Sequence, residues 1–97
     1  MDLIFSLISK TYITDAIGQK IAQETKRNVY GTKYPITRAE WNTGGQNGLK
    51  PEFMIAMFTY DYQGEELAEV EGARYGIYRT YTNNDRVELY MERKTGI

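Results

Sequence analysis

Short runs of strand-forming residues, each closed by turn residues, make up the second half of the sequence. In the last run Val87, Leu89 and Met91 alternate with polar or charged neighbours, and this period of two places all three on one face of a strand. Glu71-Gly72 and Asn83-Asn84-Asp85 are hairpin turn signals. Successive hairpins predict an antiparallel sheet that curls into a small barrel or sandwich, so the expected fold class is mainly β.

The strands expected in this half cover Phe53 to Tyr60, Glu66 to Val70, Ala73 to Tyr81, and a final run from Val87 to Met91. The first of them is apolar at consecutive positions rather than at alternate ones. A strand that is apolar on both faces is usually covered on both. We therefore expect Phe53 to Tyr60 to be buried from two sides.

Two strands of unequal length are expected in the first half. Leu3 to Ile8 forms a short buried strand, and a long polar strand runs from about Ile17 to Tyr34. Pro35 has no amide hydrogen to donate to a neighbouring strand, so the long strand ends there.

Residues 13–22, between these two strands, allow a helix or a strand. Ile13, Ile17 and Ile21 are spaced four apart, and Thr14 or Asp15 could cap a helix. The alternation of apolar and polar residues that begins at Ile17 favours the strand, because several poor helix formers follow.

One short helix is expected after Pro35. Thr37 and Glu40 have the spacing of a capping box, which predicts one or two helical turns over Arg38 to Thr43. Gly44 and Gly45 suit the end of that helix. The glycine-rich stretch from there to residue 48 is expected to be the least structured part of the chain. A long loop therefore lies between strands 2 and 3.

Length and composition limit what the chain can do. Its 97 residues fit a single domain, 1–97, with one modest core. The chain has no histidine and no cysteine, which removes the commonest general base, the thiol nucleophile and any disulfide. The four glutamates at 65, 66, 69 and 71 cluster on or beside a short strand, where solvated surface is expected. We therefore expect no enzyme, no metal and no cofactor.

The apolar stretch Leu3 to Ile8 is too short to cross a membrane and lacks the pattern of a signal peptide. A protein of the cytosol, or of an assembly made there, is expected.

Charge is unevenly spread along the chain. Residues 20–49 contain five Lys or Arg and two Glu, whereas residues 50–72 contain one Lys and six Asp or Glu. Solvated strand faces are one interpretation. The other is that basic and acidic sides of neighbouring copies face each other in a ring.

Nucleic-acid binding is an alternative function, because small barrels can hold single strands with exposed aromatic and basic side chains. The side chains that would do so are expected on adjacent strands: Tyr75, Tyr78, Tyr81 and Tyr90, with Arg74, Arg79 and Arg86 among them. The formal charge of −1 argues against a dedicated nucleic-acid binder. A free-standing β-barrel adaptor or single-stranded nucleic-acid-binding protein remains the alternative.

The order of segments along almost the whole chain resembles that of the head-closure, or head–tail adaptor, proteins of tailed bacteriophages. The motifs that carry the resemblance are Ala39-Glu40-Trp41, Gly48-Leu49-Lys50-Pro51-Glu52, Tyr62-Gln63-Gly64-Glu65 and Tyr75-Gly76-Ile77-Tyr78-Arg79-Thr80-Tyr81. Members of that family often carry Phe or Tyr at the position of Trp41, so the tryptophan is a mild departure.

The resemblance implies a structural subunit of the head–tail connector ring, with a six-stranded barrel-like fold. The ring would be a homo-oligomer, a dodecamer, in the neck of the virion and assembled in the host cytoplasm. Its implied partners are the portal-side adaptor protein, the tail terminator or tail completion protein, and packaged double-stranded DNA in the channel, with no membrane.

The resemblance also places the segment from about Arg38 to Leu49 as a loop that reaches into the channel, where some relatives use it as a stopper. Its expected channel-facing or gating residues are Asn42, Thr43, Gly44, Gly45, Gln46, Asn47 and Gly48. These side chains carry no charge, which suits a gate that must hold DNA and then release it.

Overall fold

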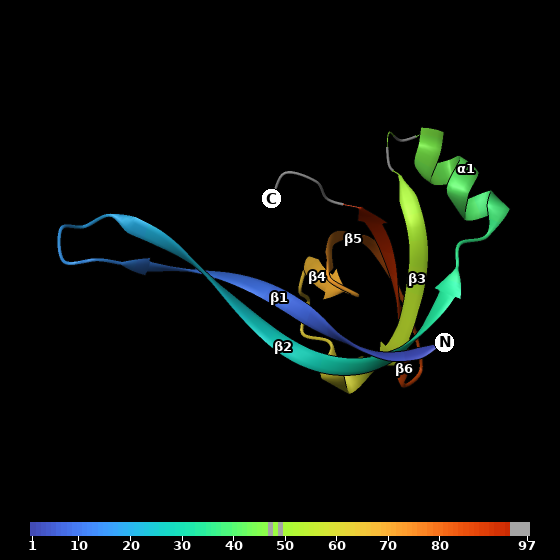
Figure 1. Cartoon of the computed structure of the whole chain (residues 1–97), viewed down its shortest axis with the longest axis horizontal. Coiled ribbons are helices and arrows are strands. Elements are labelled where there is room, and N and C mark those ends of the chain that lie inside the picture. Colours follow the sequence, from blue (N-terminus) through green and yellow to red (C-terminus); the bar gives the residue numbers. More distant parts are fainter. Residues whose placement is uncertain (47, 49, 94–97) are drawn as a thin grey trace.

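The computed structural model describes residues 1–46, 48 and 50–93, with the backbone only at residues 43–46 (Figure 1). Its regular elements, in chain order, are β1 (Asp2–Thr14), β2 (Lys20–Pro35), α1 (Arg38–Gln46), β3 (Pro51–Phe58), a 3₁₀ turn η1 (Thr59–Asp61), β4 (Leu67–Val70), β5 (Ala73–Asn83) and β6 (Arg86–Arg93). The mainly β class is confirmed.

The six strands close into one antiparallel barrel in the order β1-β2-β3-β6-β5-β4. The two-residue turn between β4 and β5 has Glu71 and Gly72 at φ 52° and 81°, and Asn84 in the next turn has φ 57°. Positive φ at such positions matches the right-handed twist of the flanking strands. The expected hairpin turns are confirmed.

The core lies inside the barrel and is formed by alternate residues of its strands. Leu89 is fully buried at its centre, and Phe53 and Tyr75 meet edge to face with ring centroids 4.7 Å apart. Gly31 allows β2 to approach β3 there, because a Cβ on it would lie 2.7 Å from Ile55 Cγ2. The buried cluster consists of Phe5, Leu7, Val29, Phe53, Ile55, Met57, Ala68, Val70, Tyr75, Val87, Leu89 and Met91.

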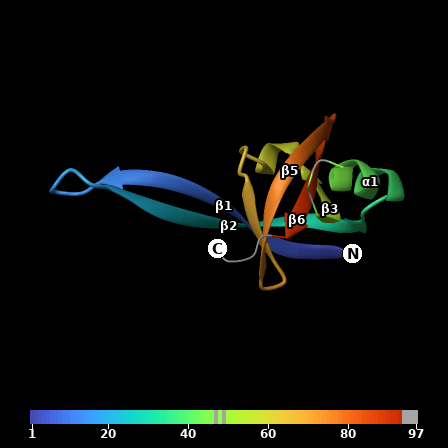
Figure 2. The same ribbon diagram turned by 90° about the horizontal axis from the view of Figure 1, so that it is seen from above.

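β1 is longer than the sequence predicts, because it continues past Ile8 to Thr14. It pairs with β4 only through Ser6–Ile8, and β2 pairs with β3 only through Thr32–Pro35. Residues 9–14 and 20–25 therefore pair only with each other, and together with their turn they form a β-hairpin, here called the arm. The arm projects from the barrel along the long axis of the molecule, which measures 50 × 30 × 24 Å (Figures 1 and 2).

Residues 13–22, for which the sequence allowed a helix or a strand, form the tip of this hairpin: two strand ends joined by a turn. The Asp15 carboxylate does cap backbone N–H groups, but they belong to Ile17 and Gln19 of a turn, at 3.0 and 2.8 Å. Gly18, at φ 86°, completes the turn. The second strand therefore begins at Lys20 rather than Ile17, and it ends at Pro35.

β3 is buried on its inward face and partly covered on its outward face. The inward side chains of Phe53, Ile55 and Met57 are buried. On the outward face Ala56 is also buried, Met54 is half-buried and Phe58 is 45% exposed. The expectation of cover from both sides therefore holds only in part for a single copy of the chain.

Candidate functional site

The connection between β2 and β3 is more helical than the sequence predicts. Helix α1 runs over Arg38–Gln46, three residues past the predicted end at Thr43, and so includes Gly44 and Gly45. A helix that has nucleated gains one hydrogen bond for each added residue, so glycines weaken it without having to end it. The left-handed glycine that often follows a helix is Gly48, at φ 77°.

The predicted channel residues are consequently not one open loop. Asn42 is exposed on α1, and the backbone of Thr43, Gly44, Gly45 and Gln46 is helical. Gly48 is exposed after the helix, and Asn47 lies outside the described residues.

Only half of the predicted capping box is present. The Thr37 hydroxyl accepts a hydrogen bond from the Glu40 backbone N–H at 3.1 Å. The Glu40 carboxylate turns toward β5 instead of back to the helix start. It accepts a hydrogen bond from the Tyr78 hydroxyl at 2.9 Å and forms an ion pair with Arg79.

These contacts continue on the outer face of the barrel. The Arg79 guanidinium lies over the ring of Tyr90, 4.0 Å from its centroid, and the Tyr90 hydroxyl donates to Glu88 at 2.7 Å. Burial, and to a lesser extent the hydrogen bond to Glu40, raises the pKa of the Tyr78 phenol. The Tyr78 hydroxyl therefore keeps its proton and remains a hydrogen-bond donor. The first turn of α1 is thus attached to β5 through Glu40, and to β6 through the contact between Arg79 and Tyr90.

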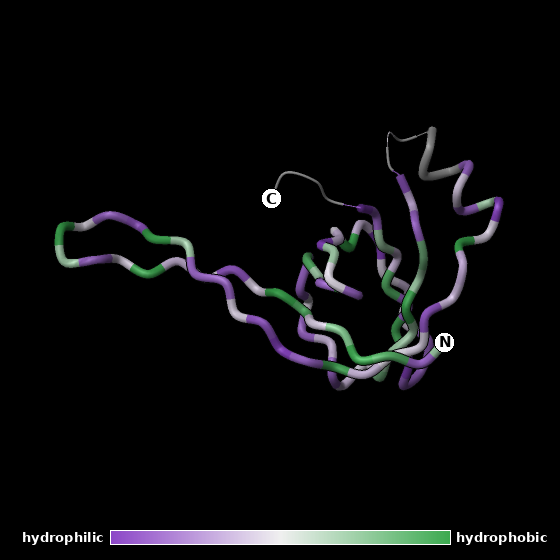
Figure 3. Tube along the Cα trace, viewed as in Figure 1, coloured by the Kyte–Doolittle hydropathy of each residue, from purple (hydrophilic) through white to green (hydrophobic). Residues whose placement is uncertain are grey.

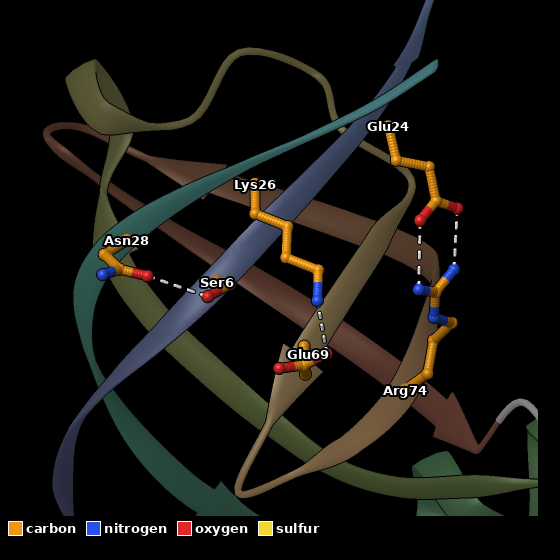
Figure 4. Close-up of polar contacts among 6 residues, drawn as sticks. All are labelled: Ser6, Glu24, Lys26, Asn28, Glu69 and Arg74. Carbon is orange, nitrogen blue, oxygen red and sulfur yellow. Dashed lines mark hydrogen bonds and ion pairs between the residues drawn. The ribbon is translucent and has the colours of Figure 1, made fainter. Parts of the chain in front are cut away.

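A second set of polar contacts braces the base of the arm (Figure 4). Arg74 of β5 forms a two-bond ion pair with Glu24 of β2, at 2.8 and 3.1 Å, and this hydrogen bonding lowers the pKa of the Glu24 carboxyl. Lys26 of β2 pairs with Glu69 of β4 at 2.9 Å. The Lys26 side chain crosses β1 to reach β4, whereas the Glu24–Arg74 pair lies beside β1; together the two bridges tie β2 to the β4–β5 hairpin. The arm therefore leaves the barrel in a fixed direction.

The arm carries large apolar side chains that the barrel does not cover. Tyr12, Ile13, Ile17 and Ile21 are exposed, and Figure 3 shows hydrophobic residues recurring out to the end of the arm. Sequence reasoning missed this surface because the same residues fitted strand alternation. The structure shows Ile13 and Ile21 paired directly across the hairpin, outside the part of β1 and β2 that pairs with the barrel.

Three cations of the basic segment pair with acids of the acidic segment inside one chain. Besides Lys26 with Glu69, Lys33 pairs with Glu71 at 3.0 Å, and Arg27 pairs with Glu65 at 2.8 Å. These pairs account for much of the uneven charge without a neighbouring copy.

Glu65 corrects the expectation that the four glutamates are solvated. It is only 7% exposed. Burial raises the pKa of its carboxyl, but hydrogen bonds from Arg27 and from backbone N–H groups outweigh that effect and hold the pKa below the usual 4.5.

The aromatic and basic side chains considered for nucleic-acid binding are mostly engaged within the chain. Tyr75 is in the core. Tyr78, Tyr90 and Arg79 belong to the contacts around Glu40, and Arg74 is paired with Glu24. Arg86 lies over the Phe58 ring, which leaves Tyr81 as the widely exposed aromatic of the group.

No protein-family model, curated protein or solved structure significantly matches the chain. Across the described residues, no helix has the length and hydrophobicity needed to span a membrane. Nor do three or more acidic side chains gather as a metal-binding group in that part of the chain.

Proposed function

We propose that this chain is a structural subunit of the head-closure ring of a tailed bacteriophage, retaining packaged DNA and providing the surface on which the tail docks. It acts there as a connector and not as an enzyme. The ring sits in the neck of the virion, between the portal-side adaptor and the tail terminator or completion protein, and surrounds the DNA channel.

One observation carries this proposal: a small closed barrel holds two projecting segments in fixed positions. The arm leaves one end, braced by the Glu24–Arg74 and Lys26–Glu69 ion pairs. The connection between β2 and β3 leaves another part of the barrel, with its stem held through Glu40 (Figure 1). Segments that a rigid scaffold positions in this way are typical of proteins that work by contact. The resemblance of the sequence motifs to head-closure proteins supplies the particular assembly.

The alternative, a single-stranded nucleic-acid binder, needs free aromatic faces and free cations on adjacent strands. Arg74 and Arg79 are instead paired with carboxylates. Tyr75 is buried. These contacts favour the connector.

The proposal is tested in the phage that encodes the chain by deleting Gly45 to Asn47, which shortens the connection while leaving Thr37 and Glu40 in place. Heads should still recruit the shortened subunit, but they should lose genome before tails attach. The measurements are the DNA content of heads and the presence of the subunit in them. Glu66→Gln, an exposed change in the β3–β4 connection, serves as the control and should behave as wild type.

Two results would contradict parts of the proposal. If the shortened subunit retained DNA as well as wild type, the connection would be passive and the function would lie in joining alone. If the chain were missing from purified virions altogether, the head-closure assignment would be wrong.

A further inference from the structure

Two apolar surfaces on this chain lie uncovered and far apart. The first is the arm tip, formed by Tyr12, Ile13, Ile17 and Ile21, whose exposed fractions run from 46% to 77%. Ile13 and Ile21 pair on one face of the hairpin, Tyr12 lies on the other face, and Ile17 is in the turn. Single exposed hydrophobic residues are common on protein surfaces, but apolar residues on both faces and at the end of a projecting hairpin mark a contact site.

The second surface, here called the outer patch, lies on the outward face of β1, β2 and β3. It consists of Ile4, Tyr30, Tyr34 and Phe58, all of them exposed. Ile4 and Tyr30 are direct partners across β1 and β2, and Tyr34 pairs with Met54 of β3. Tyr34, Met54 and Ala56 also line a hollow of about 500 Å³ that the β5–β6 turn closes on the other side.

The arm tip cannot cover the outer patch of its own chain, because the arm points away from the barrel in both views (Figures 1 and 2). It can reach a neighbour. The arm extends six residues beyond the last barrel pairing at Ile8, which is about 20 Å of strand. The two shorter dimensions of the molecule are 30 and 24 Å, so a projection of about 20 Å spans more than half the width of a copy that is packed against the base of the arm.

The charges of the two surfaces are complementary. The arm carries two lysines, Lys10 beside Glu24 at its base and Lys20 near its tip. Its two acids are engaged within the chain, Glu24 by Arg74 and Asp15 by backbone N–H groups of the turn. The outer patch and its hollow are bordered by three acids, Asp2, Asp85 and Glu88, and by two cations, Arg86 and the N-terminal ammonium, which leaves a net negative charge. Arg86 is placed over the Phe58 ring, 5.2 Å from its centroid.

We propose that the arm tip of one copy seats on the outer patch of the next copy. Each surface is therefore covered by the other kind of surface, supplied by a second copy of this chain. Because the two surfaces differ, the contact is head-to-tail, and repeating it generates a ring when the rotation closes. This inference names the contact between subunits of the ring proposed above. It rests on that proposal for the closure of the ring.

The contact explains two features that a single copy leaves unexplained. The outer face of β3 is apolar although Phe58 on it stays exposed, and the arm tip is apolar although no core faces it. A hairpin tip on a patch buries less than the roughly 1,200–2,000 Å² of a stable interface, so free copies should associate weakly.

The natural chain has no cysteine, which makes cross-linking between introduced cysteines specific. The test variant carries Ile17→Cys and Tyr34→Cys, one in each surface, and both positions are solvent-exposed. The control carries Ile17→Cys and Tyr60→Cys, because Tyr60 is 86% exposed and lies outside the outer patch. Each purified protein is treated with a short bismaleimide and analysed on a denaturing gel.

A head-to-tail contact should give a ladder of dimers, trimers and higher species from the test variant, about tenfold above the control, which corresponds to ~1.4 kcal/mol of preference. Adding Ile13→Lys and Ile21→Lys should reduce the ladder to the control level. Dimers alone from the test variant would show arm tips pairing with each other and would overturn the inference. Ladders of equal strength from both variants would reflect collision and would overturn it as well.

Failure here is distinguishable from failure of the proposed function. The cross-linking uses the pure chain, whereas DNA retention is measured in virions. A chain found in the neck that shows no arm-to-patch cross-link would refute this contact and leave the head-closure proposal standing. A cross-linked ladder from a chain missing from virions would do the reverse.

Discussion

Leu89 and Glu65 show how much single residues contribute in a barrel this small. Leu89 has no exposed surface and belongs to the buried cluster inside the barrel, with Ile55 of β3 as its cross-strand partner. Glu65 is a charged residue in a nearly buried position, and Arg27 is its main partner. Each therefore makes a separate prediction about stability.

Replacing Leu89 with Ala should lower the free energy of unfolding by roughly 2–5 kcal/mol, because it removes buried methyl groups and leaves a cavity. In a domain of this size each kcal/mol shifts the melting temperature by about 4–8 °C. Thermal unfolding followed by circular dichroism measures the change. Tyr60→Ala, an exposed truncation, should leave the melting temperature nearly unchanged. A Leu89→Ala protein that melted within a degree or two of wild type would mean that the strand register is wrong.

Glu65→Gln should destabilise the fold at neutral pH by roughly 1–3 kcal/mol, since it leaves Arg27 without its charge partner. The pKa of Glu65 is lower in the folded chain than in the unfolded one. The stabilisation by the carboxylate is therefore complete above the usual pKa of 4.5 and is lost as pH falls through the lower, folded value.

The stability difference between wild type and Glu65→Gln should consequently be largest near pH 7 and shrink below about pH 4.5. Urea unfolding at several pH values measures it. A difference that stayed constant down to pH 3 would show that Glu65 is not paired as described.

At the scale of elements, α1 depends on the barrel more than on its own sequence. It contains two glycines, and the side chain of Glu40 binds β5 rather than completing the helix start. A nine-residue helix of this composition would be marginal alone in water. Its attachment through Tyr78 and Arg79 therefore determines whether it forms.

Glu40→Gln should loosen α1 while leaving the barrel intact, because it removes the ion pair with Arg79 but keeps an acceptor for Tyr78. Arg79 is nearly half exposed, so the loss should be modest, about 1 kcal/mol or less. Hydrogen exchange should show amides of α1 exchanging up to about fivefold faster, with core strands unchanged. Arg38→Gln, on the same helix, is the matched control. Equal protection of α1 in all three proteins would mean that Glu40 does not hold the helix.

At the scale of the whole molecule, the proposed contact between copies is small, so we expect the proposed ring to need a template. The purified chain should be monomeric or weakly self-associating at micromolar concentration and physiological salt, and the proposed ring should form only on the neck layer above it. Sedimentation velocity over a concentration series tests this. A stable closed ring from the purified chain alone would count decisively against templated assembly.

The sequence predicted the structure best where the position of a residue depends on its neighbours in the chain. Val87, Leu89 and Met91 face the core on alternate positions, and the glycine and asparagine turns needed positive φ, so both could be read from local pattern. It was least informative where pairing depended on distant partners. The residues around Glu40 in the sequence do not predict its ion pair with Arg79, and those around Glu65 do not predict its ion pair with Arg27.

The arm and α1 were misjudged for related reasons. Beyond Ile8 the strand β1 has no core to impose alternation, so its continuation to Thr14 depends only on pairing with β2. The helix end was placed at the first glycines because glycine commonly follows a helix, although the left-handed residue is Gly48.

The braced arm is also a lever. A sideways force at its end acts about 20 Å from the point where β1 last pairs with the barrel at Ile8, so the torque falls on the base. The Glu24–Arg74 and Lys26–Glu69 bridges span the strands at that base and resist the bending. Ion pairs near solvent weaken as salt screens them. The stiffness of the arm should therefore fall with rising ionic strength while the apolar interior of the barrel keeps its rigidity.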